Sequence, residues 1–445
     1  MSPKLIIGTI VDSNADWSLR IRENHCIIID DNGTIVMEGP FSSQAVQQWK
    51  DKYSVTEVVE LDREEFLLPG FIDSHIHASQ LPNCGLALDL PLLKWLQTYT
   101  FPIETKFADP QYAQDVYSRA VEGTLASGTT GAMYFATIHR DASEILCDIV
   151  EEKGQRAMVG KVCMNRNSFN GYQETTQNSL NESKLFIAGV QARKSSLLDP
   201  VITPRFVPSC DQELLLGLGD LAKSSDVRIQ SHLSETLAEV AWVKELEPTS
   251  RDYTDVYRQA GLLTAKTVMA HCVHLSNAEL NAMKEAQTGI AHCPNSNCSI
   301  RSGNMDVRQI QKRGIKVGLG TDCSAGYSPS MLDAMRFAVS TSNQLQMIDP
   351  KGYNALTYAD VLYLATRGSA SVTCLDRVVG QLDEGFQFDA IRIRLNSKAH
   401  PTSHLFGHET IEDMVHKFVF LGDDRNVVQV WVNGRIVKDL GLTEH

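Results

Sequence analysis

The sequence predicts an α/β protein: a (β/α)8 TIM-type barrel joined to a small β-sandwich domain that the N- and C-terminal segments form together. Three observations support this fold. Residues 1–66 and 380–445 both alternate in the manner of β structure. Residues 67–379 instead alternate strand-length apolar runs with helical stretches, as parallel α/β folds do. The length of 445 residues suits one barrel-sized domain plus a smaller one.

Each end of the chain contains a predicted hairpin. The dipeptide Asn-Gly supplies the positive φ angles of a tight two-residue turn, and it occurs at Asn32-Gly33 and again at Asn433-Gly434. We expect the two ends to pair in one small domain, because pairing would bury both apolar faces. The predicted strands are Cys26–Asp30, Thr34–Glu38, Val58–Leu61, Ala390–Ile393, Val427–Val432 and Arg435–Lys438.

The middle of the chain carries eight strand candidates, and eight parallel strands close a barrel. The polar segment Asn165–Leu180 is predicted to be a surface loop. The strands are expected to end near His75, Thr137, Asn165, Ser209, His232, His271, Asn295 and Asp322. Helices are expected at Gln111–Ser127, Ala142–Lys153, Glu213–Ser224 and Asn277–Gln287.

The composition argues against several classes of function. The formal charge is −13 and no basic run occurs, which argues against binding a nucleic-acid backbone. No window is long and apolar enough for a membrane span, and the N-terminus lacks a signal-peptide layout. The ten cysteines are scattered singly, with no Cys-x-x-Cys pair, as expected of reduced thiols. We therefore expect a cytoplasmic protein that acts on a small molecule.

The stretch Phe66–Gln80 begins as an apolar run of strand length and ends in two histidines, His75 and His77. On an extended backbone, residues i and i+2 point to the same face, so both imidazoles face one side. Imidazole is the commonest metal ligand in proteins, and two neighbouring rings can hold one ion. A single His-x-His is as often a solvated or hydrogen-bonded pair as it is a metal-binding pair. The assignment therefore depends on the other strand ends.

Further polar residues follow predicted strands at the same end of the barrel, where such barrels carry their reactive groups. His232 follows the fifth strand, His271 ends the sixth, and Asp322 follows the eighth. Singly, such a histidine is more often structural and such an aspartate is more often a cap or turn residue. Together with the His75 and His77 pair, they predict a metal site. Glu235, three residues after His232, is predicted to be a proton carrier, and His274 a loop or helix-cap residue.

These motifs resemble those of the amidohydrolase superfamily. The resemblance implies a metal-dependent barrel with a β-sandwich split between the two ends of the chain. It rests on Pro69–His77, Ser231–Glu235, His271–His274, His292–Asn297 and Gly320–Asp322, which cover the barrel from end to end.

A closer resemblance, to members of that superfamily that deaminate guanine, rests on Ala78–Gln80, Leu92–Pro102 and Pro204–Phe206. Guanine presents acceptors at O6 and N7, which suit the donors of a guanidinium or a carboxamide. The resemblance implies that the purine contacts Gln80, Trp95, Arg205 and Phe206, together with His232, Glu235 and Asp322.

Two of these residues have an ordinary alternative. Leu92, Trp95, Leu96 and Tyr99 follow helical spacing, so Trp95 fits a packing role in an amphipathic helix. Arg205 lies within the predicted fourth strand, where a buried charge needs a partner. An internal ion pair is its alternative to contact with the substrate.

The resemblance also implies a mechanism. His75, His77, His232 and Asp322 would hold one zinc ion per subunit, with one position left for water. Binuclear relatives commonly use a lysine at the end of the fourth strand, and Val201–Cys210 contains none, so we expect a single metal. A water activated by the metal would attack C2 of guanine.

The roles of the remaining groups follow from the same resemblance. Asp322 would accept the proton of the water, His271 would orient it, and Glu235 would protonate a ring nitrogen and the leaving amino group. The products would be xanthine and ammonia. A homodimer is also implied.

Two competing interpretations remain. The chain fits an amidohydrolase-fold deaminase or hydrolase of another heterocycle, such as a pterin, a triazine or a modified purine. It also fits a non-catalytic scaffold of the same fold. A scaffold, however, has no need of all five polar residues at the strand ends, which are His75, His77, His232, His271 and Asp322. Cys293 and Cys298 are spaced too widely for the Pro-Cys-x-x-Cys signature of other zinc deaminases, and are expected to be packing or loop residues.

Overall fold

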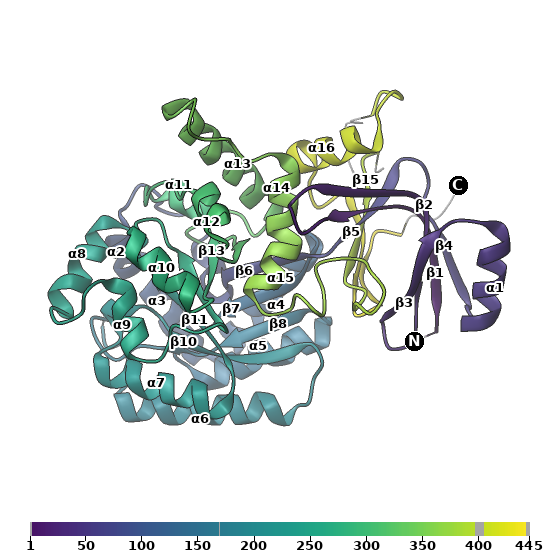
Figure 1. The fold of residues 1–445 in the computed structure, drawn as a ribbon. Coiled ribbons are helices and arrows are strands. Elements are labelled where there is room, and N and C mark those ends of the chain that lie inside the picture. The colour runs from purple at the N-terminus through teal and green to yellow at the C-terminus, as the bar shows by residue number, and fades with distance from the viewer. Residues whose placement is uncertain (1, 169, 397–404, 442–445) are drawn as a thin grey trace.

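The computed structural model describes residues 2–168, 170–396 and 405–441, which form two sheets with surrounding helices (Figure 1). One sheet forms the barrel, and its strands follow one another in chain order from β6 to β14. The other combines strands from both ends of the chain. The predicted fold class, an α/β barrel with a small β domain from the two termini, is confirmed.

Eight parallel strands form the barrel, as predicted, and each ends within a few residues of its expected position. Backbone hydrogen bonds join the turn after the last strand to the first strand: the N–H of Asp322 donates to the His75 carbonyl at 2.9 Å, and the N–H of His77 donates to the Cys323 carbonyl at 3.0 Å. A short strand, β9 (Val162–Cys163), pairs with β10. The eight are β6 (Phe71–His77), β7 (Thr129–Phe135), β8 (Arg156–Gly160), β10 (Leu198–Pro204), β11 (Arg228–Leu233), β12 (Thr267–His271), β13 (Gly289–His292) and β14 (Val317–Leu319).

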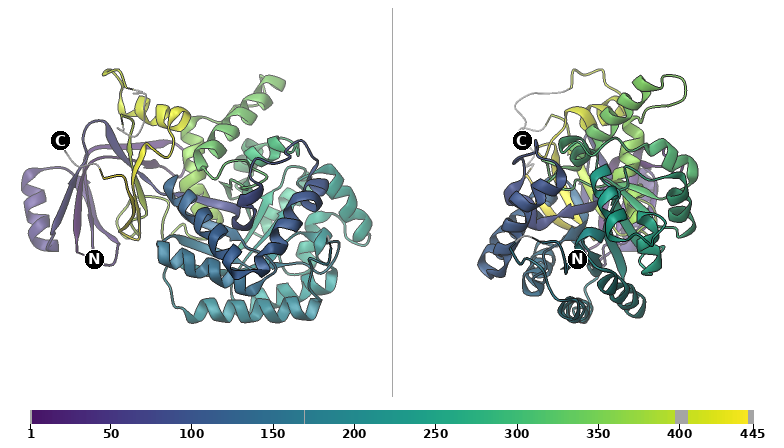
Figure 2. Two further views of the ribbon diagram at one scale, coloured as in Figure 1. Left: turned by 180° about the vertical axis from the view of Figure 1, so that it is seen from behind. Right: turned by 90° about the vertical axis from the view of Figure 1, so that its left-hand side faces the viewer.

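Helices cover the outside of the barrel (Figure 2). Side-chain caps fix several helix starts, including Asp109 before α4 and the capping boxes that Thr236 and Ser276 form before α8 and α10. The four predicted helices are confirmed within two residues at each end, as α4, α5, α7 and α10. The helices are α4 (Pro110–Ala126), α5 (Arg140–Lys153), α6 (Thr176–Ala192), α7 (Gln212–Ser225), α8 (Leu237–Leu246), α9 (Tyr253–Gln259), α10 (Asn277–Glu285), α11 (Pro294–Ser299), α12 (Val307–Arg313), α13 (Met331–Ile348), α14 (Tyr358–Tyr363) and α15 (Ser369–Val372).

The connection from β6 to β7 is a nearly continuous helical segment over the mouth of the barrel. It runs through α2 (Leu92–Trp95), a π-helical turn (Leu96–Thr100) and α3 (Phe101–Glu104). Its buried residues include Leu92, Trp95 and Leu96, so the predicted amphipathic helix is confirmed.

The prediction of a surface loop over Asn165–Leu180 is wrong in two places. Thr175 caps α6, which begins at Thr176, because the threonine hydroxyl accepts from the backbone of Asn178. Tyr172 is buried, since its hydroxyl donates to Glu104 across the mouth of the barrel. The polar side chains that predicted a loop instead belong to a helix cap and to the first turn of the helix.

The second sheet joins the two ends of the chain. The junction is the antiparallel pairing of β5 (Glu65–Pro69) with β15 (Ala390–Arg394), and both predicted hairpins form. The placement of the domain boundaries at residues 66 and 380 remains a proposal. The other strands are β1 (Lys4–Ser13), β2 (Leu19–Ile29), β3 (Ile35–Pro40), β4 (Glu57–Glu60), β16 (Val427–Val432) and β17 (Arg435–Asp439), with helices α1 (Ser43–Tyr53) and α16 (Ile411–Leu421).

All ten cysteines lie in the described part of the chain, and none of them is in a disulfide. Among the described helices, none has both the length and the apolar character needed to cross a membrane.

A buried ion pair ties the barrel to the second sheet. Arg156, at the start of β8, donates from Nε to Asp389 Oδ2 at 2.9 Å and from Nη2 to Oδ1 at 3.0 Å. Asp389 also accepts from the backbone N–H of Asn433, in the turn of the C-terminal hairpin. Both charged side chains are almost fully buried, so neither has water as an alternative partner.

Substituting Asp389→Ala should therefore lower the free energy of unfolding by about 3–5 kcal/mol, because Arg156 would remain buried without a counter-charge. Thermal denaturation followed by circular dichroism would measure the change as a lower Tm. The matched control is Asp115→Ala, which breaks the exposed ion pair with Arg119 and should cost less than about 1 kcal/mol. Equal Tm values for the two variants would contradict a structural role for the Arg156–Asp389 pair.

Candidate metal centre and active site

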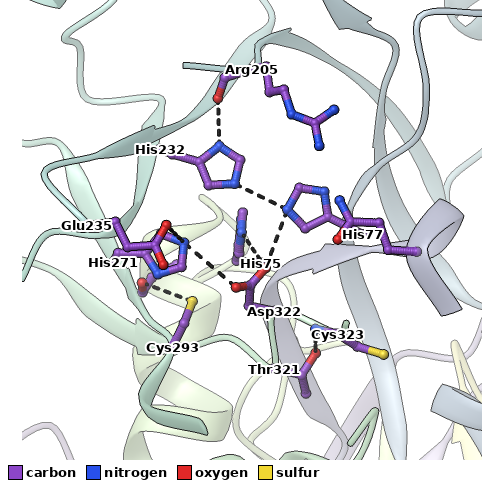
Figure 3. Close-up of polar contacts among 12 residues, drawn as sticks. His75, His77, Arg205, His232, Glu235, His271, Cys293, Thr321, Asp322 and Cys323 are labelled. Atoms are coloured by element: carbon purple, nitrogen blue, oxygen red, sulfur yellow. Dashed lines mark hydrogen bonds and ion pairs between the residues drawn. The ribbon is translucent and has the colours of Figure 1, made fainter. Parts of the chain in front are cut away.

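The predicted metal ligands converge at the carboxyl end of the barrel (Figure 3). His77 Nε2 lies 3.2 Å from His232 Nε2 and 3.4 Å from Asp322 Oδ1. His75 Nε2 lies 3.2 Å from the same Asp322 oxygen. The side chains come from the end of β6, from β11 and from the turn after β14, so residues separated by almost 250 positions in the chain meet at one point.

This arrangement fits a tetrahedral metal ion. Ligand atoms about 2.1 Å from a tetrahedral centre lie about 3.4 Å from one another, close to the observed separations. His75 Nε2 is buried and makes no hydrogen bond, as expected of an atom whose partner is a cation. His232 Nδ1 lies 2.6 Å from the Arg205 carbonyl oxygen, and this contact directs Nε2 of the ring towards the cluster.

Local backbone geometry aims these groups into the mouth of the barrel. His75 and His77 point inward because strand residues alternate, and Ile76 between them packs in an apolar cluster on the other face. His271 and Asp322 both have positive φ angles, of 68° and 45°. Such strained conformations in residues other than glycine persist only where the surroundings impose them, and they concentrate at functional sites.

Burial sets the charge states of the cluster. Desolvation lowers the pKa of His75 and lowers the pKa values of His77 and His232 well below the ordinary value, so all three rings are neutral and able to bind a metal. Burial alone would raise the pKa of Asp322, but its contact with His75 at 3.2 Å and the nearby His271 and His77 rings lower it, so Asp322 is a carboxylate. Neutral imidazoles and one carboxylate are a typical zinc ligand set.

Glu235 and His271 form a second pair beside the metal ligands. His271 Nε2 lies 3.5 Å from Glu235 Oε2 and 3.8 Å from Asp322 Oδ2. Burial raises the pKa of Glu235 to about 7, aided by nearby carboxylates and opposed by His271. Burial lowers the pKa of His271, but Glu235, Asp322 and the Asn297 amide oxygen outweigh it, so the net shift is upward. Glu235 is thus suited to give or accept a proton near neutral pH.

A pocket opens directly above these groups. The empty space in it is about 390 Å³, including the part open to solvent. One side carries the polar cluster, and the other is mainly apolar. The lining residues are His77, Gln80, Leu92, Trp95, Leu96, Arg205, Phe206, His232, Glu235, His271, Asp322 and Ala325.

Trp95 has a packing role and lies in the pocket wall, whereas its contact with a substrate remains a proposal. The ring lines the pocket, yet it is also a buried packing residue whose indole N–H donates to the Leu86 carbonyl at 3.0 Å. This bond fixes the ring as part of the pocket wall. Arg205 likewise lines the pocket and also forms the internal ion pair that was its alternative, with Glu104. The prediction that Arg205 lies within the fourth strand is wrong by one residue, because β10 ends at Pro204.

Sequence reasoning missed Glu104. It is completely buried and pairs with Arg205, 101 positions away in the chain. A glutamate near a helix end ordinarily indicates an exposed position, and no local pattern distinguishes this one. Asn297 and Ser302, which orient His271 and Glu235, were also not assigned roles, although Asn297 lies in a motif that carried the family resemblance.

The other two predictions near the site concern His274 and Cys293. His274 lies in the turn after β12 and contacts the Ser302 carbonyl, outside the residues that line the pocket. Cys293 is buried, with its sulfur near His75 and His271. Burial raises the pKa of the Cys293 thiol well above its usual value, so the thiol is protonated at neutral pH when no metal is bound.

Known proteins are similar to this chain over nearly its whole length. A guanine deaminase from Homo sapiens is 44% identical over 436 residues, which are 97% of this chain and 95% of that protein. A guanine deaminase from Dictyostelium discoideum is 42% identical over 443 residues, which are 98% of each. The crystal structure of guanine deaminase from C. acetobutylicum with bound guanine superposes with a TM-score of 0.90 at 35% identity, covering 98% of this chain and all of that one.

A sequence profile of the amidohydrolase family matches residues 66–437, from the last strand before the barrel to the C-terminal hairpin. This span includes every predicted metal ligand and both members of the Glu235–His271 pair. The chain belongs to the amidohydrolase family.

Proposed function

We propose that the protein is a zinc-dependent guanine deaminase, which hydrolyses the C2 amino group of guanine to give xanthine and ammonia. The observation that carries the proposal is the convergence of three neutral histidines and a carboxylate beside a buried glutamate with a pKa of about 7, at the base of a small pocket. Guanine deaminases 42–44% identical to this chain over nearly its full length support the same substrate.

His75, His77, His232 and Asp322 are proposed to hold one zinc ion per subunit. When bound, the ion would lower the pKa of a coordinated water from about 15.7 towards 7 and so supply a nucleophile at neutral pH. A single ion is supported by the absence of lysine from Val201–Cys210. The buried Lys161, after β8, is already paired with Glu174 at 2.7 Å.

The residues around this centre are proposed to move protons. Asp322 accepts the proton of the attacking water, because it is ionised and its second oxygen faces His271. His271 holds the water in line with the ring and is itself held by Asn297. Glu235 donates a proton to a ring nitrogen, regains one from the hydroxyl group added at C2, and donates it to the leaving amino group, which a carboxyl group with a pKa of about 7 is able to do at neutral pH. The proton that Asp322 took from the water then restores Glu235 for the next turnover.

The pocket walls are proposed to position the ring. Trp95, Leu96 and Phe206 provide apolar surface of the kind that planar heterocycles bind. Arg205 offers N–H groups that suit the O6 oxygen of guanine. We further propose a homodimer, as the family resemblance implies, and a cytosolic location, which the ten unpaired thiols support.

The purified protein loaded with zinc should convert guanine to xanthine and release one ammonia per guanine, measured by ultraviolet absorbance and by a coupled ammonia assay. Adenine, a pterin and a triazine serve as comparison substrates in the same assay. Efficient turnover of one of these without turnover of guanine would contradict the proposed substrate and favour another heterocycle.

Substituting His77→Ala should empty the metal site, because it removes one of four ligands and leaves the others too few to retain the ion. Metal analysis of the purified protein would then give far less than one zinc per chain, and activity would be lost. His416→Ala, which removes an exposed histidine on α16, is the matched control and should keep full zinc content. Full occupancy in the His77 variant would refute the ligand assignment.

Substituting Glu235→Gln should leave the zinc content unchanged and reduce kcat by about 10²–10⁴-fold, because the amide keeps the shape of the side chain but carries no transferable proton. Glu245→Gln, at an exposed position on α8, is the control for the same chemical change. Turnover of the Glu235 variant at the rate of this control would remove Glu235 from the mechanism.

A further inference from the structure

Glu104 lies behind the pocket wall with every acceptor position of its carboxylate occupied. Arg205 donates from Nη1 to Oε2 at 2.7 Å and from Nη2 to Oε1 at 3.1 Å. The Gln80 amide nitrogen donates to Oε1 at 3.1 Å, and the Tyr172 hydroxyl donates to Oε2 at 2.9 Å. A carboxylate has about four lone-pair positions, so four donors leave none for a ligand. Glu104 is fully buried and does not line the pocket.

The carboxylate fixes the direction of the groups around it. A carboxylate only accepts hydrogen bonds, so the Gln80 side chain must turn its nitrogen towards Glu104, and its oxygen Oε1 therefore points elsewhere. Tyr172 must donate to Glu104, and its oxygen in turn accepts from the backbone N–H of Ile138 at 3.2 Å. Arg205 uses two of its five N–H groups on Glu104, stacks on the Phe101 ring, and keeps three N–H groups for other partners.

We propose that Glu104 is a positioning residue that sets the specificity of the pocket. By orienting Gln80 and Arg205, it makes the wall present an acceptor, Gln80 Oε1, beside donors, the free N–H groups of Arg205. This combination is complementary to a lactam edge, in which a ring N–H lies next to a carbonyl oxygen. The inference rests on the proposed function, because guanine carries this edge at N1–H and O6.

The same orientation disfavours related purines. The corresponding edge of adenine has an acceptor at N1 and a donor at N6, which reverses both partners. The base 2-aminopurine keeps the C2 amino group on which the reaction occurs, but has an acceptor at N1 and only a C–H at position 6. A site with buried polar groups discriminates strongly against a ligand that leaves them unpaired. The ratio of kcat/KM for guanine to kcat/KM for 2-aminopurine therefore measures how well the wall is oriented.

Substituting Glu104→Gln tests this role, because the neutral amide no longer forces Gln80 to donate towards it. We expect kcat/KM for guanine to fall by about tenfold or more, the size of one lost hydrogen bond, and kcat/KM for 2-aminopurine to fall much less. The ratio of kcat/KM for guanine to kcat/KM for 2-aminopurine would therefore decrease. Glu174→Gln is the control, because it weakens another buried glutamate pair, with Lys161, outside the pocket. In the Glu174→Gln variant the ratio of the two kcat/KM values should equal that of the wild type, even if the Tm of the variant is lower.

A second variant tests the orientation without altering Glu104. In Gln80→Glu, a carboxyl group next to the Glu104 carboxylate should be protonated, because two carboxylates in contact do not both ionise readily. Its hydroxyl would donate to Glu104 and its carbonyl oxygen would replace Gln80 Oε1. At each pH, the turnover of guanine by the Gln80→Glu variant is divided by that of the wild type. This relative turnover should be substantial at low pH and should fall as the pH rises. An equal loss at every pH would contradict the proposed orientation of Gln80.

The two proposals fail in different ways. A wild-type protein that turns over neither purine would contradict the proposed guanine deaminase function. A wild type that prefers guanine, combined with a Glu104→Gln variant that loses activity on both purines in parallel, would contradict only the specificity role. That second result is what a purely structural role predicts.

Discussion

The hydrogen bonding of the turn after the last barrel strand to the first strand is the contact on which the site depends. The backbone bond from Asp322 to the His75 carbonyl joins this turn to β6 and places two metal ligands side by side. Asp73 strengthens this junction, because it accepts from the Thr321 hydroxyl at 2.5 Å and from the Thr321 and His75 backbone N–H groups. Burial raises the pKa of Asp73 to about 7, and these bonds oppose the shift. The hydrogen bonds that close the barrel thus also fix the geometry of the metal centre.

Burial then gives each group in the mouth its chemical role. Desolvation keeps the His75, His77 and His232 rings neutral, whereas Asp322 stays ionised among them. Three neutral rings and one buried carboxylate leave a net negative charge that a divalent cation would neutralise. Glu235, which contacts His271 at 3.5 Å, has a pKa of about 7, so the site separates a metal-binding carboxylate from a proton-transfer carboxyl group. Two acidic groups that both lie beside His271 have different proposed functions because their other neighbours differ.

The sequence predicted most of the fold and the whole polar cluster for a simple reason. Strand and helix periods are local signals, and parallel strands bring their carboxyl ends together, so polar residues after those strands were expected to meet. The roles of Glu104 and Tyr172 depend on contacts between distant segments. Glu104 meets Arg205 across 101 positions, and Tyr172 lies in a polar stretch that reads as an exposed loop. Local sequence patterns also could not decide between an internal ion pair and a place in the pocket for Arg205. The structure shows that the two are compatible.

The central claim is that side chains from β6, β11 and the turn after β14 surround a single cation. Anomalous diffraction from crystals of the zinc-loaded protein, measured on both sides of the zinc absorption edge, tests it most directly. The account predicts one peak per chain, about 2.0–2.2 Å from Nε2 of His75, His77 and His232 and from the Asp322 carboxylate. Two peaks in the barrel mouth, or a peak away from these four side chains, would contradict it.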